Sequence, residues 1–434
     1  MGPIECGIAG IILMVILFLL KMPIAFAMAL VGLLGFSYIV SWSAGASMLA
    51  RDLFGQFYSY SLCAITMFVL MGSFAFIAGI GERLYKAAYA LVGDLRGGLG
   101  IATVLGCAGF AAICGSTSAT AATMGRIVLP EMKKYRYEDT LATGTVASAG
   151  TLGILIPPST IFIVYGFLTE QSIGKLFVSG IFPGLILALI FSVTIYLICK
   201  INPQLGPPGE RLTWSKKIKS SFQALEALLL FLLVIGGLFL GWFSPVEAGG
   251  IGALCALVIG LLRRQIKWKI FTQFIKDGLE TATMILCLIA GATIFGRFMA
   301  VTTIPFIIAD WVQSLPFSPN AIMAVIVLIF LLGGCFMDSM ALITLLVPVI
   351  YPVVLRLGFD PIWFGVIIVL TTEAGVVTPP VGVNVYVTKS LAPHVPLEKI
   401  FKGTFPFLLG IIFLTVLVIV FPQIVLFLTE YVKY

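Results

Sequence analysis

The sequence predicts an all-α polytopic membrane protein with about ten transmembrane spans, two re-entrant hairpins and inverted-topology repeats. Three observations support this prediction: the composition, the lengths of the apolar runs and a repeated pattern of Gly and Pro. Of the 434 residues, 60% are hydrophobic and 10% are charged, and the mean hydropathy is +1.13. Soluble proteins carry about 25% charged residues. The composition therefore excludes a soluble enzyme, a disordered chain and a nucleic-acid-binding module.

Long apolar runs match the roughly 20 residues that a helix needs to cross the hydrocarbon layer. They lie near 4–20, 24–43, 62–80, 176–199, 222–243, 246–262, 279–300 and 404–429. The first run lacks the basic start of a signal peptide, so we interpret it as a span. Two further crossings, near 140–169 and 361–390, are interrupted by Pro-Pro pairs. Two regions, near 98–133 and 319–356, are broken by small polar residues, which predicts hairpins that enter and leave on one side.

The distribution of Lys and Arg predicts the orientation of the chain. If the N-terminus lies outside, 21 of the 26 cations fall in inside segments, as the positive-inside rule requires. The outside segments hold Arg51, Lys175, Arg356 and Lys433. Both termini are therefore predicted to lie outside. Segments 81–97 and 264–277 are predicted as amphipathic helices on the inner surface, with ordinary basic loops as the alternative.

An internal repeat appears when the chain is shifted by 222 residues. The shift places Pro130 on Pro352, Gly153 on Gly375, and Pro157–Pro158 on Pro379–Pro380. Five predicted crossings separate the starts of the two units, near 62 and 279, and an odd number makes the units point in opposite directions. Inverted repeats with paired broken helices are typical of secondary transporters, with the site near the midplane. Chance matching of a few Gly and Pro is the alternative.

The repeat divides the chain into four predicted parts. Residues 1–61 form N-terminal scaffold spans, and 201–278 form a linker with further scaffold spans. The first repeat, 62–200, contains the hairpin near 98–133 and the broken helix near 140–169. The second, 279–434, contains the hairpin near 319–356 and the broken helix near 361–390.

The first hairpin tip and the first broken span offer oxygen ligands without a carboxylate. The tip reads Gly-Ser-Thr-Ser over 115–118, and the broken span reads Gly-Ile-Leu-Ile-Pro-Pro-Ser over 153–159. Proline lacks an N–H and disfavours helical geometry before it, so unpaired carbonyls gather at 153–156. Free carbonyls in hydrocarbon need a partner, and the hydroxyls of Ser116, Thr117 or Ser118 complete a shell for a monovalent cation. We predict sodium, with close helix packing by small residues as the alternative.

The second half repeats this arrangement with two acids, Asp338 at its hairpin tip and Glu373 in its broken span. Acids within a membrane mark ion or proton pathways. Asp338 is predicted to bind a second cation or to cap a half-helix. Glu373 is predicted to pair with a basic group or to carry a proton. A proton-coupled anion carrier that uses Asp338 and Glu373 is therefore the alternative function.

Arg297 is the cation that falls inside a predicted span. A guanidinium fork recognises carboxylate, sulfonate or phosphate oxygens at two points, so Arg297 is predicted to contact an anionic substrate. The alternatives are snorkelling from a span end and an internal pair with Glu373 or Asp310. The sequence contains no GxxxxGK[ST] motif and offers no His partner for a catalytic Ser, so we predict that the protein is not an enzyme.

The sequence resembles the large membrane subunit of tripartite ATP-independent periplasmic (TRAP) transporters. The resemblance is strongest in GSTSATAATMGRIVLPEM (115–132), ATGTVASAGTLGILIPPSTIFIVYGFLTEQSIGKLFVSGIFPG (142–184), MDSMALITLLVPVIYPV (337–353) and EAGVVTPPVGVNVYV (373–387). It implies an elevator-type, sodium-driven importer of small organic anions in the bacterial inner membrane. It also implies two partners, namely a soluble periplasmic protein that captures the substrate and a separate small membrane subunit of about four helices. Nucleic acid is not an expected partner.

The resemblance also implies ligand sets. A first sodium is expected at Ser116, Thr117, Gly153 and Pro157, and a second at Asp338, Ser339, Thr372, Gly375 and Thr378. An arginine before the second hairpin binds the substrate's acid group in some members, and Arg297 is similarly placed. The predicted substrate-binding residues are Arg297, Ser116, Ser159 and Asn384.

Overall fold

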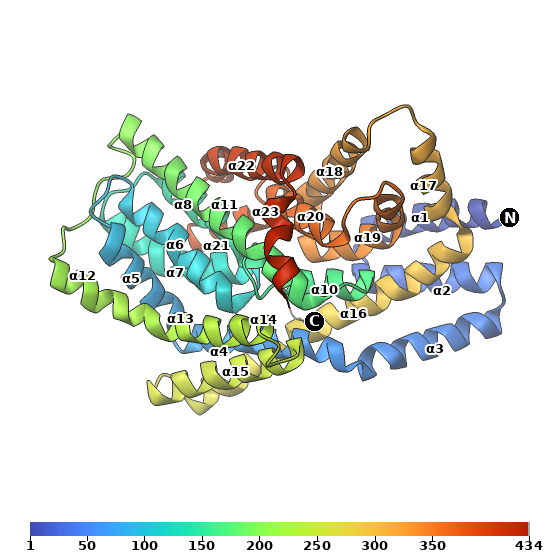
Figure 1. Ribbon diagram of the computed structural model, residues 1–434, viewed down its shortest axis with the longest axis horizontal. Coiled ribbons are helices and arrows are strands. Elements are labelled where there is room, and N and C mark those ends of the chain that lie inside the picture. Colours follow the sequence, from blue (N-terminus) through green and yellow to red (C-terminus); the bar gives the residue numbers. More distant parts are fainter. Residues whose placement is uncertain (433–434) are drawn as a thin grey trace.

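The computed structural model describes residues 1–432 and is built of helices, with no strand in that range (Figure 1). Eight helices are long and apolar enough to cross a membrane, or up to nine if a bent pair counts as one span. The prediction of an all-helical, multi-pass membrane protein is confirmed. The predicted outer position of Lys433 lies outside the described residues.

The N-terminal helices pack against one long helix from the middle of the chain. Helices α2 (Ile24–Ile39) and α3 (Trp42–Tyr58) lie beside α16 (Trp268–Thr302), and α1 (Pro3–Leu19) lies next to α2 (Figure 1). A Cβ on Gly32 would lie 2.8 Å from the Ile294 backbone, so this glycine allows α2 and α16 to approach closely. Helix α3 was not predicted, because Arg51 and Asp52 interrupt its apolar pattern.

Helix α16 differs from its prediction. The sequence predicted a surface helix over 264–277 and a separate span over 279–300, but 35 residues form one continuous helix. No proline interrupts residues 268–302, so the backbone hydrogen bonds continue through the junction. The basic start of this helix is therefore joined rigidly to its apolar body.

The predicted first repeat begins with α4 (Cys63–Ile77) and α5 (Ile80–Val92). Next come α6 (Gly98–Cys114) and α7 (Thr117–Lys134), which are joined by a two-residue break at the predicted hairpin tip. The predicted broken span contains α8 (Asp139–Ala149), α9 (Leu152–Leu155) and α10 (Thr160–Thr169), with a bend of 42° between α9 and α10. Helix α11 (Ile173–Ile201) completes this unit.

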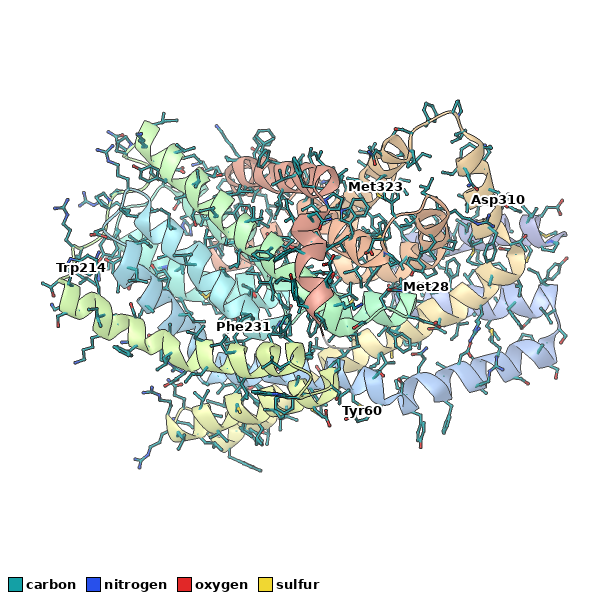
Figure 2. The ribbon with its side chains drawn as sticks, in the orientation of Figure 1. Met28, Tyr60, Trp214, Phe231, Asp310 and Met323 are labelled. Atoms are coloured by element: carbon teal, nitrogen blue, oxygen red, sulfur yellow. The ribbon has the colours of Figure 1, made fainter. Side chains whose placement is uncertain are left out.

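The linker region contains α12 (Trp214–Ser221), α13 (Leu225–Phe231), α14 (Gly237–Phe239) and α15 (Pro245–Leu262). Residues Trp214–Phe239 together form one span-length helical segment. Helix α12 buries none of its residues. Figure 2 shows Trp214, at its start, at the opposite end of the molecule from Asp310 on α17 (Ile304–Ser314).

The predicted second repeat continues from α16 through α17 to α18 (Pro319–Phe336) and α19 (Ser339–Arg356). Helix α20 (Pro361–Gly375) is followed by the diproline segment and α21 (Val383–Leu391). Next come α22 (Leu397–Val420), α23 (Gln423–Leu426) and a short 3-10 helix, Phe427–Tyr431. Helices α18 and α19, which were predicted as one hairpin, have 18 residues each and are long enough to span.

The two predicted repeats pack directly against each other at the centre of the molecule. Gly144 on α8 and Gly403 on α22 bring their backbones into contact. The Tyr165 hydroxyl on α10 donates a hydrogen bond to the carbonyl of Pro361, at 2.6 Å. These contacts hold the two broken segments side by side.

Candidate binding site at the two helix breaks

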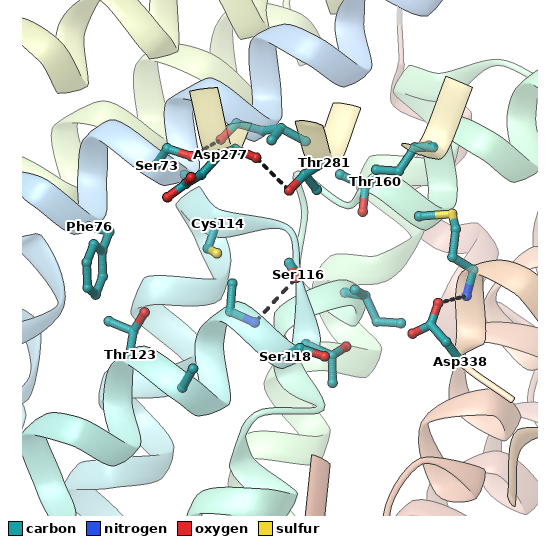
Figure 3. Close-up of a pocket in the computed structure, with 18 of the residues that line it drawn as sticks. Ser73, Phe76, Cys114, Ser116, Ser118, Thr123, Thr160, Asp277, Thr281 and Asp338 are labelled. Atoms are coloured by element: carbon teal, nitrogen blue, oxygen red, sulfur yellow. Dashed lines mark hydrogen bonds between the residues drawn. The ribbon is translucent and has the colours of Figure 1, made fainter. Parts of the chain in front are cut away.

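A cavity of about 690 Å³ lies where the hairpin tips and the helix breaks meet α4 and α16. Figure 3 shows Ser116 and Ser118 near its centre, with Thr123 on one side and Asp338 on the other. Six of the residues predicted from the sequence line this cavity, namely Ser116, Thr117, Ser118, Asp338, Ser339 and Asn384. The structure therefore brings together residues that lie more than 200 positions apart in the chain.

The first hairpin tip is a sharp turn between α6 and α7. Gly115 has a φ of +65°, a left-handed conformation that glycine adopts without strain. The Ser116 hydroxyl then caps α7 by accepting a hydrogen bond from the Ala119 N–H, at 3.4 Å. The Gly115 carbonyl accepts a hydrogen bond from the Thr160 hydroxyl at 2.9 Å, which ties the tip to the start of α10.

Gly153 brings the first broken span against this tip. A Cβ on Gly153 would lie 2.5 Å from the Ser116 carbonyl oxygen and 2.8 Å from the Thr120 hydroxyl oxygen. The buried Thr120 hydroxyl lies beside the Cys114 thiol but makes no hydrogen bond of ordinary length to any residue within 1–432. Two oxygens thus converge on the glycine. Sequence reasoning included Ser116 and Gly153 in the first ligand set but missed Thr120, which lies one helical turn after Ser116.

The second hairpin tip repeats this geometry with an acid. Asp338 caps α19, and its Oδ2 accepts a hydrogen bond from the Met340 N–H at 3.0 Å. A Cβ on Gly375 would lie 2.5 Å from the backbone of Gly334, near the end of α18. The glycines that the sequence repeat aligned, Gly153 and Gly375, therefore both pack on the backbone of a hairpin.

The predicted threonine ligands of the second break keep free acceptor capacity. The Thr372 hydroxyl donates to the Val369 carbonyl at 3.0 Å, and the Thr378 hydroxyl donates to the Ala374 carbonyl at 2.6 Å. A hydroxyl that donates its proton retains oxygen lone pairs. Both oxygens therefore remain able to ligate a cation.

Glu373 joins the two predicted repeats. Its carboxylate is fully buried, and Oε1 accepts a hydrogen bond from the Thr117 hydroxyl at 3.0 Å. Oε2 has no hydrogen-bond partner of ordinary length within residues 1–432, although Asp338 and Ser339 lie nearby. The predicted basic partner of Glu373 is absent from the described ion pairs. A buried acid of this kind needs a cation or a proton to balance it.

The remaining predicted substrate residues occupy different surroundings. Asn384 lines the cavity and donates a hydrogen bond to the Ala147 carbonyl at 3.1 Å. Ser159 is buried and caps α10 by accepting from the Phe162 N–H at 3.4 Å, and it does not line the cavity. The substrate role of Ser159 stays a prediction.

Arg297 lies outside the cavity wall. Its Nε atom is 3.2 Å from Oδ2 of the buried Asp52 on α3, and about half of its side chain is exposed. Neither of the partners considered from the sequence pairs with it. Glu373 instead accepts a hydrogen bond from Thr117, and Asp310 forms an ion pair with Arg356 at 3.2 Å. Substrate contact by Arg297 stays a prediction.

Comparison with known proteins shows the family of this chain. The family model of the tripartite ATP-independent periplasmic transporter, DctM component, matches residues 11–424. This chain belongs to that family. It is 37% identical, over 87% of its length and 88% of the relative, to the C4-dicarboxylate TRAP transporter large permease protein DctM of Pseudomonas aeruginosa. It is 32% identical, over 94% of its length and 95% of the relative, to the sialic acid TRAP transporter large permease protein SiaM of Vibrio cholerae.

A solved structure supports the fold of this DctM-family chain. The crystal structure of the Alcanivorax borkumensis YdaH transporter superposes with a TM-score of 0.63 and 14% sequence identity. The alignment covers 88% of this chain and 89% of that chain. At this identity the likeness extends to the fold alone.

The sodium ions that the TRAP resemblance implies can be tested against the buried oxygens of this DctM-family chain. Unsatisfied buried atoms at the tips and breaks include Thr120 Oγ1, Ser339 Oγ, Glu373 Oε2 and Asn384 Oδ1. All are oxygens, which are the ligands that hard cations prefer, and buried polar groups rarely remain without a partner. The residues present therefore fit sodium.

Sequence reasoning missed two charged residues of the cavity. Arg126 on α7 and Asp277 on α16 both line it. From the sequence, Arg126 is predicted only as an inside charge, and residue 277 lies at the end of a predicted surface helix. The periodicity of α7 contained a usable signal, because Arg126 lies seven residues after Ala119 and therefore on the same face.

Proposed function

We propose that this chain is the sodium-coupled transmembrane core of a TRAP system that imports a small organic anion. The observation that supports this proposal is the convergence of both hairpin tips and both helix breaks on one cavity. The relatives named above are permeases for a C4-dicarboxylate and for sialic acid, so a carboxylate is the expected substrate class, and sulfonates remain open.

Sodium acts on the two breaks in this proposal. The first ion binds at Ser116, Thr117, Gly153 and Pro157, and the second at Asp338, Ser339, Thr372, Gly375 and Thr378. Each ion draws a hairpin tip against a broken span, and the ordered tips shape the anion site between them. Thr117 also bonds Glu373 at 3.0 Å, so an ion at the first tip changes the surroundings of the second.

Transport follows an elevator motion in this proposal. The re-entrant hairpins, the broken spans and the helices that follow them move as one unit against a scaffold built from the remaining spans. Each net positive charge that moves inward gains about 2.3 kcal/mol per 100 mV of membrane potential. When two or more net positive charges move inward with each anion, the membrane potential therefore drives the substrate to accumulate inside.

The same proposal assigns two partners. A periplasmic binding protein delivers the anion, and a small membrane subunit of about four helices braces the scaffold in the bacterial inner membrane. Exposed aromatic residues such as Phe54 and Tyr58 on α3 are proposed to lie where the small subunit packs. Both termini are proposed to face the periplasm.

Uptake by proteoliposomes that contain this chain and its two partners tests the coupling ion. We expect uptake of a labelled C4-dicarboxylate or sialic acid when external sodium exceeds internal sodium, and no uptake when choline replaces sodium. Uptake that persists in choline would remove the sodium proposal.

The buried, half-satisfied Glu373 favours a second candidate, a proton-coupled anion carrier. In that case an inward proton gradient drives uptake in choline, and Glu373→Gln abolishes it. Sodium coupling predicts instead that a proton gradient alone drives no uptake in the wild-type chain.

The predicted anion contact of Arg297 has its own test. We expect Arg297→Ala to reduce anion uptake while sodium binding, measured separately, is retained. Uptake at the wild-type rate would limit Arg297 to its ion pair with Asp52.

A further inference from the structure

One face of α7 runs from the central cavity to a second one. Ala119, Ala122, Arg126, Leu129 and Lys133 follow one another at alternating spacings of three and four residues, which places them on a single helical stripe. The first three line the cavity of about 690 Å³. The last three line a second cavity of about 400 Å³. At 1.5 Å per residue the stripe is about 21 Å long.

Arg126 lies at the middle of this stripe and lines both cavities. It is the only Lys or Arg on the wall of the central cavity within residues 1–432. The acids on that wall, Asp277 and Asp338, come from other elements, and Asp338 is engaged as the cap of α19. Lys133 extends the basic character into the second cavity, where Asp139 also lies, 3.9 Å from His394.

The Arg126 guanidinium makes no hydrogen bond or ion pair with another described residue. The arginines at 83, 263, 297 and 356 each pair with an acid. Arg126 therefore does not hold α7 to a neighbour. Arg126 is an exposed residue that lines both cavities. Its planar fork of five donors matches the two oxygens of a carboxylate or sulfonate.

We propose that Arg126 binds the acid group of the transported anion, and that the anion leaves along α7 past Lys133. This proposal rests on the proposed function and adds Arg126, on the cavity wall, to the predicted anion contact of Arg297. Thr123 and Ser118, which line the same cavity, offer hydroxyls to the rest of the molecule. The bound class is a small organic acid with at least one carboxylate or sulfonate group.

The test uses the purified full-length chain and its thermal unfolding midpoint. Succinate, N-acetylneuraminate and isethionate are titrated separately at saturating sodium, and sodium is titrated separately without anion. We compare wild type with Arg126→Gln, Arg126→Lys and Arg96→Gln. Arg96 is the matched control, because it is an exposed arginine that lines neither cavity.

We expect at least one anion to raise the wild-type midpoint. Arg126→Gln should raise the half-saturating concentration of that anion by about 10- to 100-fold, the usual effect of losing charged hydrogen bonds. Arg126→Lys keeps the charge without the fork and should give a smaller loss, while Arg96→Gln matches wild type. The sodium response should persist in all three variants.

A half-saturating anion concentration within twofold of wild type in Arg126→Gln would overturn this inference and leave sodium-coupled transport standing. So would a wild-type chain that binds sodium but none of the three anions. A wild-type chain without any sodium response would overturn the proposed function, and the role of Arg126 with it.

Chemical modification keeps the test decisive if Arg126→Gln does not fold. Phenylglyoxal modifies accessible guanidinium groups, and peptide mass spectrometry reports each arginine in the wild-type chain. We expect the anion to slow modification of Arg126 at least fivefold relative to Arg96. Equal rates with and without anion would overturn the proposal.

Discussion

The two helix breaks share their geometry but differ in their charge. At each, a glycine packs on the backbone of a hairpin, with Gly153 against Ser116 and Gly375 against Gly334. The first break has neutral oxygens, whereas the second adds the carboxylates of Asp338 and Glu373. Close packing of the break against the hairpin backbone and negative charge at the break are therefore separate features of this site. Variants that fill the glycine contacts should affect the two breaks equally. Variants that remove a carboxylate should affect the second break more than the first.

The largest expected effect comes from filling the glycine contacts. In Gly153→Ala and Gly375→Ala the new methyl group would lie 2.5 Å from backbone atoms that cannot rotate away. We expect sodium-driven uptake to fall to background in both, with a loss of about 1–3 kcal/mol in unfolding free energy from overpacking. Uptake assays and detergent-phase unfolding measure the two effects.

Gly296→Ala is the matched control for this prediction. Its added Cβ would meet only Pro348 Cβ, at 3.7 Å, so uptake should stay near wild type. A Gly375→Ala chain that retains half of the wild-type uptake would show that the contact between break and hairpin is not needed.

Removal of charge from the second tip should give the next largest effect. Asp338→Asn keeps an oxygen that accepts from the Met340 N–H, because asparagine is also a good helix cap. We expect the half-saturating sodium concentration to rise about 10- to 100-fold, since interactions with a charged group contribute roughly 1.5–3 kcal/mol.

Ser116→Ala provides the comparison at the first tip. It removes one neutral oxygen and the helix cap, so its sodium affinity should fall less, by about fivefold, from the loss of roughly 1 kcal/mol. Equal shifts in Asp338→Asn and Ser116→Ala would contradict the assigned difference between the tips.

The smallest effect concerns the hydrogen bond between the two tips. A double-mutant cycle of Thr117→Val and Glu373→Leu, each of which removes one partner, should give a coupling of about 1 kcal/mol in unfolding free energy, the usual net contribution of a hydrogen bond. Additive effects of the two substitutions would show that the 3.0 Å contact does not couple the two halves.

The sequence located both tips because local chemistry fixes them. Gly115 allows the left-handed turn, Ser116 and Asp338 cap the helices that follow, and the diproline segments end α9 and α20. Helix α3 was not predicted because Arg51 and Asp52 interrupt its apolar pattern. The sequence predicted a boundary between 277 and 279 because charged residues give way to apolar ones there, but the helical backbone of α16 continues through this point.

The sequence by itself determined the membrane-protein class, the family and the two interruptions, since apolar length, proline and glycine act on the backbone where they stand. Only the tertiary structure decided that Thr117 meets Glu373 across 256 residues, that Arg297 pairs with Asp52, and that Arg126 lines the cavity without an ion pair to any residue within 1–432. Helical periodicity assigns a residue to a face of its helix. Which partner covers that face depends on how distant helices pack, and no local pattern encodes it.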